Sequence, residues 1–257
     1  MEVSQVNSGT SLYASSVQAD RISEAVKKPL ERLDQKVEST KVRLSTYGQM
    51  KSADEQVQQA AKALQEASGQ GSFEAVKKAT QSFVDAVNKQ QGVANQASTD
   101  DRNASERTQA SDSRLRLAAS EMRRAVQGNN GSNLPDLKQA GITVAKDGSV
   151  NFDAKQLEKA YQADPSKLAE TLNRAAKETS AAATRQVSSN DGVGASVDRM
   201  KEQLRNLEQN RANYQAQLES AQRTVDQRNQ QVEQARAQTQ QAFGFGGVSA
   251  YKGVLSF

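Results

Sequence analysis

Apolar side chains recur at alternating steps of three and four residues throughout the stretch 197–242. This heptad spacing places them along one stripe of an α-helix and is typical of the seam of a coiled coil. At 1.5 Å per residue the predicted helix is roughly 70 Å long. The seam positions are Val197, Met200, Leu204, Leu207, Arg211, Tyr214, Leu218, Ala221, Val225, Arg228, Val232, Ala235, Thr239 and Ala242.

Three members of this seam, Arg211, Arg228 and Thr239, are polar. Polar groups at seam positions cost stability but can fix the register and the number of partner helices. Alternatively, the coil is loosely packed there and the long arginine side chains extend outward to water. The pattern favours this second interpretation.

A second seam lies near the N-terminus, in a helix predicted to begin near Gln18. Pro29 lies early in it and predicts a kink or a later helix start. We expect the segments 18–66 and 195–242 to pair as a coiled-coil leg. The seam positions are Val26, Leu30, Leu33, Val37, Thr40, Leu44 and Tyr47, and after a shift of phase Met50, Val57, Ala61 and Leu64.

Turn signals mark off residues 73–190 as a small middle domain, between Ser68-Gly69-Gln70-Gly71-Ser72 and a second breaker at 190–194. A helix from Phe73 is predicted to end near Gly92. Residues 93–112 hold almost no large apolar groups and predict an exposed loop or a frayed helix. The apolar positions of the helices on either side are Phe73, Val76, Phe83, Val84 and Val87, and Leu115, Leu117, Met122 and Val126.

The only β signal lies near residues 142–152, where two short β-branched runs flank Asp147-Gly148. This pattern predicts a hairpin. Asp153 is a predicted helix N-cap, and Asp164-Pro165 reads as the N-cap and first residue of a further helix. The fold class predicted is therefore mainly α, with long N- and C-terminal helices and a small helical middle domain that carries one hairpin.

The composition suits thin helical bundles, in which each helix buries one stripe. Hydrophobic residues make up 35%, aromatic residues 4%, and the mean hydropathy is -0.79. The 34 Lys and Arg and 30 Asp and Glu are interspersed without a polybasic run, so we expect no binding to nucleic acid. No apolar stretch approaches 18 residues, so we expect no membrane insertion.

The chain contains no Cys and no His, which removes thiol nucleophiles, histidine bases, disulfides and the usual zinc ligands. Asp147, Asp153 and Asp164 invite a metal or acid–base reading, but a turn and two helix caps explain them more simply. The glycine-rich segment 244–247 is not followed by Lys-Ser/Thr, as a phosphate loop requires. We therefore predict no catalytic residue, no cofactor, no metal site and no enzymatic activity.

The two ends of the chain differ in character. Residues 1–17 are polar, lack the apolar core of a Sec signal peptide and are predicted to be mobile. Residues 243–257 form a tail rich in glycine and aromatic residues, which reads equally as a contact segment or as a disordered tail. Its apolar members are Phe243, Phe245, Tyr251, Val254, Leu255 and Phe257.

Five segments carry motifs that occur together in a characteristic order: 28–36, 47–52, 82–88, 115–117 and 137–165. The last segment is the most specific and contains Ala140-Gly141-Ile142-Thr143, Asp147-Gly148-Ser149-Val150, Phe152-Asp153, Leu157 and Ala163-Asp164-Pro165. In this order the segments resemble the bacterial flagellar filament-capping proteins, the hook-associated protein two family.

The resemblance implies export through the flagellar type III pathway, with the N-terminal segment as the signal. It further implies assembly of several copies at the distal end of the filament, where the family promotes the insertion of flagellin by templating. The partners implied are flagellin, other copies of the chain, and further a hook–filament junction protein and an export chaperone. Family members usually carry two β-rich head domains after the leg, whereas here only about Gln65 to Phe73 occupy that place, which predicts a minimal form.

Two alternatives remain open. The chain could be another exported axial or tip component, such as a hook–filament junction protein or a relative of the type III needle tip. It could also be an intracellular coiled-coil spacer or an export chaperone. In the cap interpretation the leg interface comprises Val26, Leu30, Leu33, Val37, Leu44, Tyr47, Val197, Met200, Leu204, Leu207, Tyr214, Leu218, Val225 and Val232.

Overall fold

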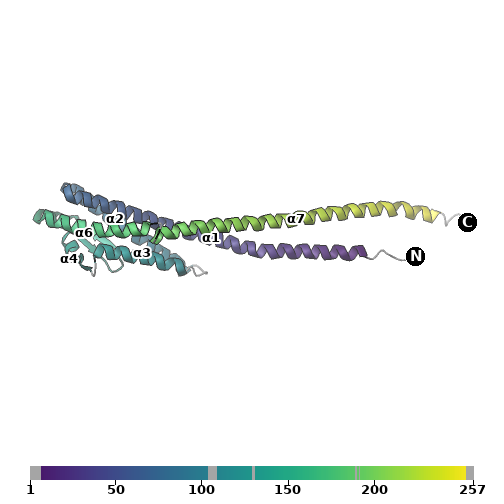
Figure 1. Ribbon diagram of the computed structural model, residues 1–257, viewed down its shortest axis with the longest axis horizontal. Helices are drawn as coiled ribbons and strands as arrows, with labels where there is room; N and C mark the ends of the chain where they lie inside the picture. The colour runs from purple at the N-terminus through teal and green to yellow at the C-terminus, as the bar shows by residue number, and fades with distance from the viewer. Residues whose placement is uncertain (1–6, 104–108, 129–130, 189, 191, 253–257) are drawn as a thin grey trace. The chain divides into compact units, whose positions relative to one another are not determined.

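The computed structural model describes the backbone of residues 7–103, 109–128, 131–188, 190 and 192–252 (Figure 1). Side chains are described for residues 25–69, 71–97, 113–128, 131–188, 190 and 192–238. Helices dominate these residues, and two strands form one small sheet, which confirms the predicted fold class. The apolar residues of the C-terminal tail, and Thr239 and Ala242 of the seam, have side chains outside the described set, as do residues 1–6 entirely.

Two long helices, α1 (Asn7–Gln70) and α7 (Gly192–Lys252), contain the two predicted seams. α1 begins earlier than the start predicted near Gln18, because adding a residue to an existing helix costs little compared with nucleating one. Pro29 lies inside α1, so the prediction of a later start there is wrong. Its ring nitrogen cannot donate to the Ala25 carbonyl, and the helix continues with that one bond missing.

In the described part of the chain, five shorter helices and one hairpin lie between α1 and α7. In chain order they are α2 (Phe73–Asn103), α3 (Gln109–Gln127), α4 (Leu134–Gln139), β1 (Ile142–Val144), β2 (Val150–Phe152), α5 (Ala154–Ala163) and α6 (Pro165–Val187).

α2 extends to Asn103, so the predicted end near Gly92 is wrong. Beyond Gly92, Ala94 is buried, and Val93 and Ala97 pack against the same core cluster. These small contacts carry the helix past the glycine. The structure has helix at 93–103 and from Gln109 onward, so the exposed-loop alternative is wrong for these residues. Residues 104–108 lie outside the described set.

The hairpin forms as predicted, with β1 and β2 antiparallel and Ile142 opposite Phe152. Gly148 has φ 91°, a conformation that favours glycine, and the Asp147 carboxylate accepts from the Ser149 hydroxyl at 2.7 Å. The Ser149 backbone N–H also donates to the Asp147 carboxylate, at 3.0 Å, and the two hydrogen bonds from Ser149 lower the pKa of Asp147. The side chain of Asn88 on α2 bonds to both backbone polar groups of Val150 in β2. Val150 N donates to Asn88 Oδ1 at 2.7 Å, and Asn88 Nδ2 donates to Val150 O at 2.8 Å.

The two predicted N-caps are confirmed. The Asp153 carboxylate accepts from the backbone N–H groups of Lys155 and Gln156 at 2.9 and 3.1 Å, at the start of α5. Asp164 accepts from Lys167 N at 2.9 Å, with Pro165 as the first residue of α6. Because these otherwise unpaired donors are satisfied, each helix can begin directly after its cap residue.

The chain divides into two compact units. Unit 1 contains residues 1–38 and 205–257, and unit 2 contains residues 39–204. The long helices α1 and α7 each contribute to both units.

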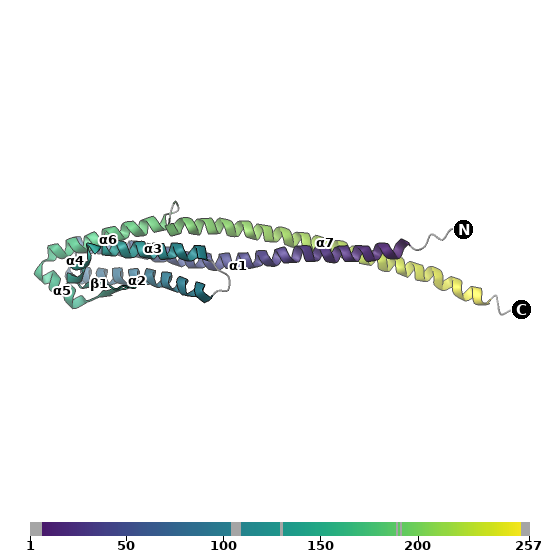
Figure 2. The ribbon, with the colours of Figure 1, turned by 90° about the horizontal axis from the view of Figure 1, so that it is seen from below.

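Unit 2 contains the buried core. α2, α3 and α6 lie along one another, while α4, α5 and the hairpin gather at one end of these helices (Figure 2). Most of the buried apolar residues of unit 2 form two separate clusters, and Ala53, Ala182 and Ala195 belong to neither. The first core cluster consists of Val57, Ala61, Leu64, Val76, Phe83, Val84, Ala86, Val87, Met122, Val126, Leu137, Ala140, Ile142, Val150, Leu157, Leu168, Leu172, Ala175, Ala176 and Ala183. The second core cluster consists of Tyr47, Met50, Ala94, Leu115, Ala118, Ala119, Val193, Val197 and Met200.

Candidate functional site

The candidate interaction surface is the apolar stripe of unit 1. There the N-terminal part of α1 and the C-terminal part of α7 run antiparallel, toward the N and C marks of Figure 1. Asp34 and Arg211 join the two segments by an ion pair of 2.5 Å between Asp34 Oδ1 and Arg211 Nε. Both atoms are shielded from solvent, and their contact lies outside hydrogen-bonding geometry.

None of the described seam residues predicted for the leg interface is fully exposed. Val37 lies buried in unit 1, and Tyr47, Val197 and Met200 lie buried in unit 2. Leu44 and Leu204 of unit 2 are partly buried. The partly buried members of unit 1 are Val26, Leu30, Leu33, Leu207, Tyr214, Leu218, Val225 and Val232.

Partial burial is the physical signature of a two-helix pairing, because a single neighbouring helix covers only one side of each seam residue. The rest of each apolar side chain in unit 1 stays accessible and can contact another helix. We call the partly buried apolar residues of unit 1 the half-buried stripe.

The polar seam positions behave differently from one another. Arg228 is exposed, as expected of an arginine that extends outward. Arg211 is partly buried and paired with Asp34, so at this position the charge is matched across the two segments. A half-exposed pair of this kind contributes about 0–1 kcal/mol to stability and mainly fixes the register.

The aspartates that invited a chemical reading have structural roles here, as a turn residue and two helix caps. Among the residues that the structure describes, no group of three or more His, Cys, Asp or Glu side chains is placed to hold a metal ion. Nor does any helix in the described ranges have the length and apolarity needed to cross a membrane.

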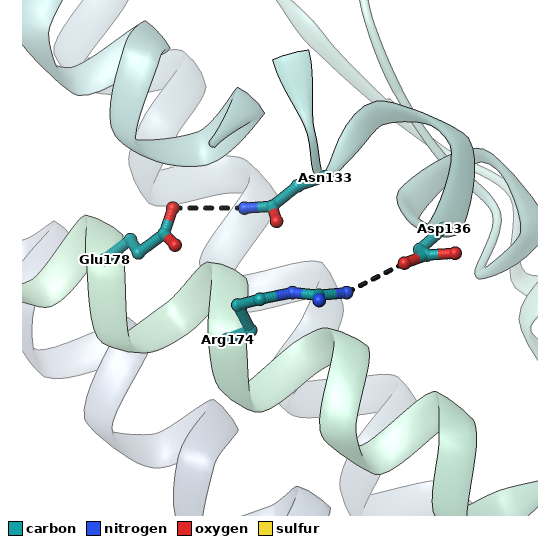
Figure 3. A network of polar contacts seen from close by, with 4 residues as sticks. All are labelled: Asn133, Asp136, Arg174 and Glu178. Atoms are coloured by element: carbon teal, nitrogen blue, oxygen red, sulfur yellow. Dashed lines mark hydrogen bonds and ion pairs between the residues drawn. The ribbon is translucent and has the colours of Figure 1, made fainter. Parts of the chain in front are cut away.

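A polar network joins α4 to α6 within unit 2 (Figure 3). Asn133 Nδ2 donates to Glu178 at 3.2 Å, and Arg174 pairs with Asp136 at 2.8 Å. Beside it a groove of about 420 Å³ is lined by charges of both signs, including Lys159 and Lys167 with Asp136 and Asp164. The pair between Asp136 and Arg174 fixes the short helix α4 against α6. Asp164, which also lines the groove, caps α6.

One buried group escaped the sequence reasoning. Asp54 is 0% exposed in the core of unit 2, and burial raises its pKa to about 7. The sequence signal was an acidic residue on the α1 stripe between Met50 and Val57, at steps of four and three.

These observations define a class: a mainly α-helical protein whose two long helices carry a half-buried heptad stripe. A family model described as the flagellar hook-associated protein 2 C-terminus matches residues 56–241, well over half of the 257 residues. The chain belongs to the flagellar hook-associated protein 2 family, the structural proteins of the flagellar filament cap. Searches among curated proteins and among solved structures gave no match.

The turn between α1 and α2 bears on the form that the family takes here. α1 ends at Gln70 and α2 begins at Phe73, and Gly71 N donates to Ala67 O at 2.8 Å to close the helix end. The resemblance places the head domains of the family at this point. The chain has only this tight turn there.

Proposed function

We propose that the chain is a minimal filament-cap protein, which oligomerises at the distal end of the bacterial flagellar filament and promotes the assembly of flagellin. The match to the family over residues 56–241 is the observation that carries this proposal. The half-buried stripe of unit 1 supports it, because the stripe offers partly covered leucine and valine side chains to further helices.

The partners proposed are flagellin and other copies of the chain, with a hook–filament junction protein and an export chaperone as further contacts. Burial of apolar surface drives such contacts by about 25 cal/mol for each Å² removed from water. The heptad spacing of the stripe selects helical partners with matching seams. Promotion of assembly then consists of holding an incoming helical segment in place, with no bond made or broken.

The proposed location is outside the cell at the filament tip, after export through the flagellar type III pathway. This location follows from the family and from the polar N-terminal segment predicted as the export signal.

Deletion of the gene, followed by electron microscopy of the cells and an assay of flagellin in the medium, tests the proposal. We expect filaments to be absent or stunted and flagellin to accumulate in the medium, and both defects to be reversed by the wild-type chain supplied in trans. Normal filaments with no released flagellin would refute a capping role and favour the other axial or spacer functions.

A further inference from the structure

The two core clusters of unit 2 are separated by a layer of polar side chains. On α1, Met50 belongs to the second core cluster and Val57 to the first. Asp54 lies between them on the same stripe and is 0% exposed. A charged residue type at such a position is uncommon, because burying a carboxylate without partners costs several kcal/mol.

α2 repeats this arrangement. Val87 belongs to the first core cluster and Ala94 to the second, and Gln90 and Gln91 lie between them, 0% and 5% exposed. Gln91 Nε2 donates to Gln90 Oε1 at 3.1 Å. The two glutamines therefore fill the same level of the core as a connected pair.

α3 and α6 complete the level. On α3, Ala119 of the second core cluster precedes Met122 of the first, and the Ala119 carbonyl accepts from Gln91 Nε2 at 2.9 Å. Glu121 lies between these two and accepts a short hydrogen bond from Gln186 of α6, which is 6% exposed. We call Asp54, Gln90, Gln91, Glu121 and Gln186 the polar layer.

The polar layer is incompletely bonded. Neither oxygen of the Asp54 carboxyl has a hydrogen-bond partner of regular geometry among the described residues, and the same holds for Gln90 Nε2, although the Gln90 amide approaches the carboxyl closely enough to lower its pKa. Each such buried group costs about 1–3 kcal/mol, and an ionised carboxylate costs more than a neutral one. The free energy of the layer therefore depends strongly on whether the Asp54 carboxyl is neutral or ionised.

The charged groups around Asp54 do not relieve its burial. Glu55 follows it on α1 and repels its charge, and is itself paired with Lys51 at 3.9 Å. α2 presents the neutral amides of Gln90 and Gln91. α3 and α6 contribute the Glu121 carboxylate and the amide of Gln186, which bond to each other. Burial raises the pKa of Asp54 most, Gln90 lowers it, and Glu55 raises it, to about 7.

We propose that the polar layer is a proton-controlled opening point in unit 2. While the Asp54 carboxyl is neutral, the two core clusters stay coupled. Once it is ionised, the second core cluster opens in part of the molecules while the first stays folded. The second core cluster is the weaker one, because among the described residues it contains nine buried apolar residues against twenty in the first. Because Val193, Val197 and Met200 belong to it, opening frees the first turns of α7.

The direction of the pH effect follows from linkage. In the opened state the Asp54 carboxyl is solvated and ionises near its ordinary pKa of 3.8, whereas in the closed state it ionises near 7. Between these two values opening releases a proton, so the opened population rises by up to ~10-fold per pH unit. Above about pH 7 both states are ionised, and the population levels off.

Native-state hydrogen exchange on the full chain at pH 5, 6, 7 and 8 tests the proposal, with each rate corrected for the intrinsic base-catalysed rate of the amide. In the wild-type chain we expect the protection of residues 115–119 and 193–200 to fall at least tenfold from pH 5 to pH 8. The protection of the first-cluster segments 83–87 and 168–176 is expected to stay constant.

Two variants complete the design. Asp54→Asn replaces the carboxyl by a neutral group of the same shape and should make the protection of the second-cluster segments independent of pH. Glu55→Gln, which removes the neighbouring partly exposed carboxyl, should retain the pH dependence. Equal pH dependence in the wild type and Asp54→Asn, or an equal loss of protection in both clusters, would overturn the proposal.

A measurement on the wild-type chain alone keeps the test independent of how the variants fold. Carbon NMR of the aspartate carboxyl groups should show Asp54 titrating far above the other aspartates, near pH 7. Titration of every aspartate near pH 4 in the folded chain would equally overturn the proposal.

Discussion

Two leucines show how differently the two units use the same apolar spacing. Leu172 on α6 is 0% exposed in the first core cluster of unit 2, whereas Leu218 on α7 is only partly buried in unit 1. In unit 2 several helices surround each core position, so the apolar side chains bury one another completely. In unit 1 two helical segments face each other, and one side of the stripe stays accessible. The apolar side chains of unit 2 are thus buried within the unit itself, whereas unit 1 keeps part of its apolar surface accessible.

The sharpest test of this contrast is a matched pair of truncations. Leu172→Ala should destabilise unit 2 by about 2–5 kcal/mol, because it opens a cavity in a closed core. Leu218→Ala in the isolated chain should cost less than half as much, because its side chain is already partly solvated. Urea unfolding followed by circular dichroism measures both, and equal losses would contradict the contrast between the units.

The pH dependence of stability examines the exception within unit 2, its polar layer. A folded-state pKa near 7 against an ordinary value of 3.8 means that the stability due to neutral Asp54 is full below about pH 4 and is lost as the pH rises to about 7. The shift corresponds to a loss on the order of 4 kcal/mol.

Asp54→Asn should remove this loss and stabilise the chain at pH 8 relative to the wild type. Urea midpoints of the two chains at pH 5 and pH 8 give the comparison. A variant less stable than the wild type at pH 8 would show that the carboxylate has partners after all.

A third test asks whether the hydrogen bonds that attach the hairpin to α2 stabilise unit 2. Asn88→Ala removes both hydrogen bonds to Val150 and should cost about 1–3 kcal/mol, because the Val150 N–H and C=O lose their partner. Asn151→Ala, on the exposed side of the same strand, is the matched control and should change stability by less than about 0.5 kcal/mol. Similar effects of the two substitutions in urea unfolding would mean that the attachment contributes little.

The smallest effect is expected from the ion pair of unit 1. A double-mutant cycle of Asp34→Ala and Arg211→Ala should give a coupling energy of at most about 1 kcal/mol, decreasing with added salt. A coupling above about 2 kcal/mol that salt does not weaken would mean that the pair is shielded from water, as the core of unit 2 is.

Local chemistry made much of the fold predictable. Asp147-Gly148, Asp153 and Asp164-Pro165 each carry a turn or cap preference in their own side chains, and each prediction was correct. The end of α2 was misplaced because Gly92 is a local signal, while Ala94 packs on a distant cluster that no local signal reveals. The short helix α4 was missed for a similar reason, since its anchor is the pair between Asp136 and Arg174 from α6.

The candidate site divides in the same way. The half-buried stripe follows from heptad spacing alone, so its residues could be named from the sequence. The polar layer could be anticipated only in part: Asp54 stands on the apolar stripe of α1, but Gln90 and Gln186 lie far from it in the chain, and no local signal shows that they are buried. Only the fold shows that each of them is buried at a position between the two core clusters.

We propose that copies of the chain assemble through the half-buried stripe of unit 1. Sedimentation equilibrium of Leu207→Asp/Leu218→Asp against Asn206→Asp/Gln217→Asp tests this proposal most directly. The second variant adds the same two charges to the neighbouring exposed positions of α7. We expect the wild type and the exposed-face variant to form oligomers of the same mass, and the stripe variant to sediment as a monomer. Oligomers of unchanged mass in the stripe variant would contradict assembly through the stripe.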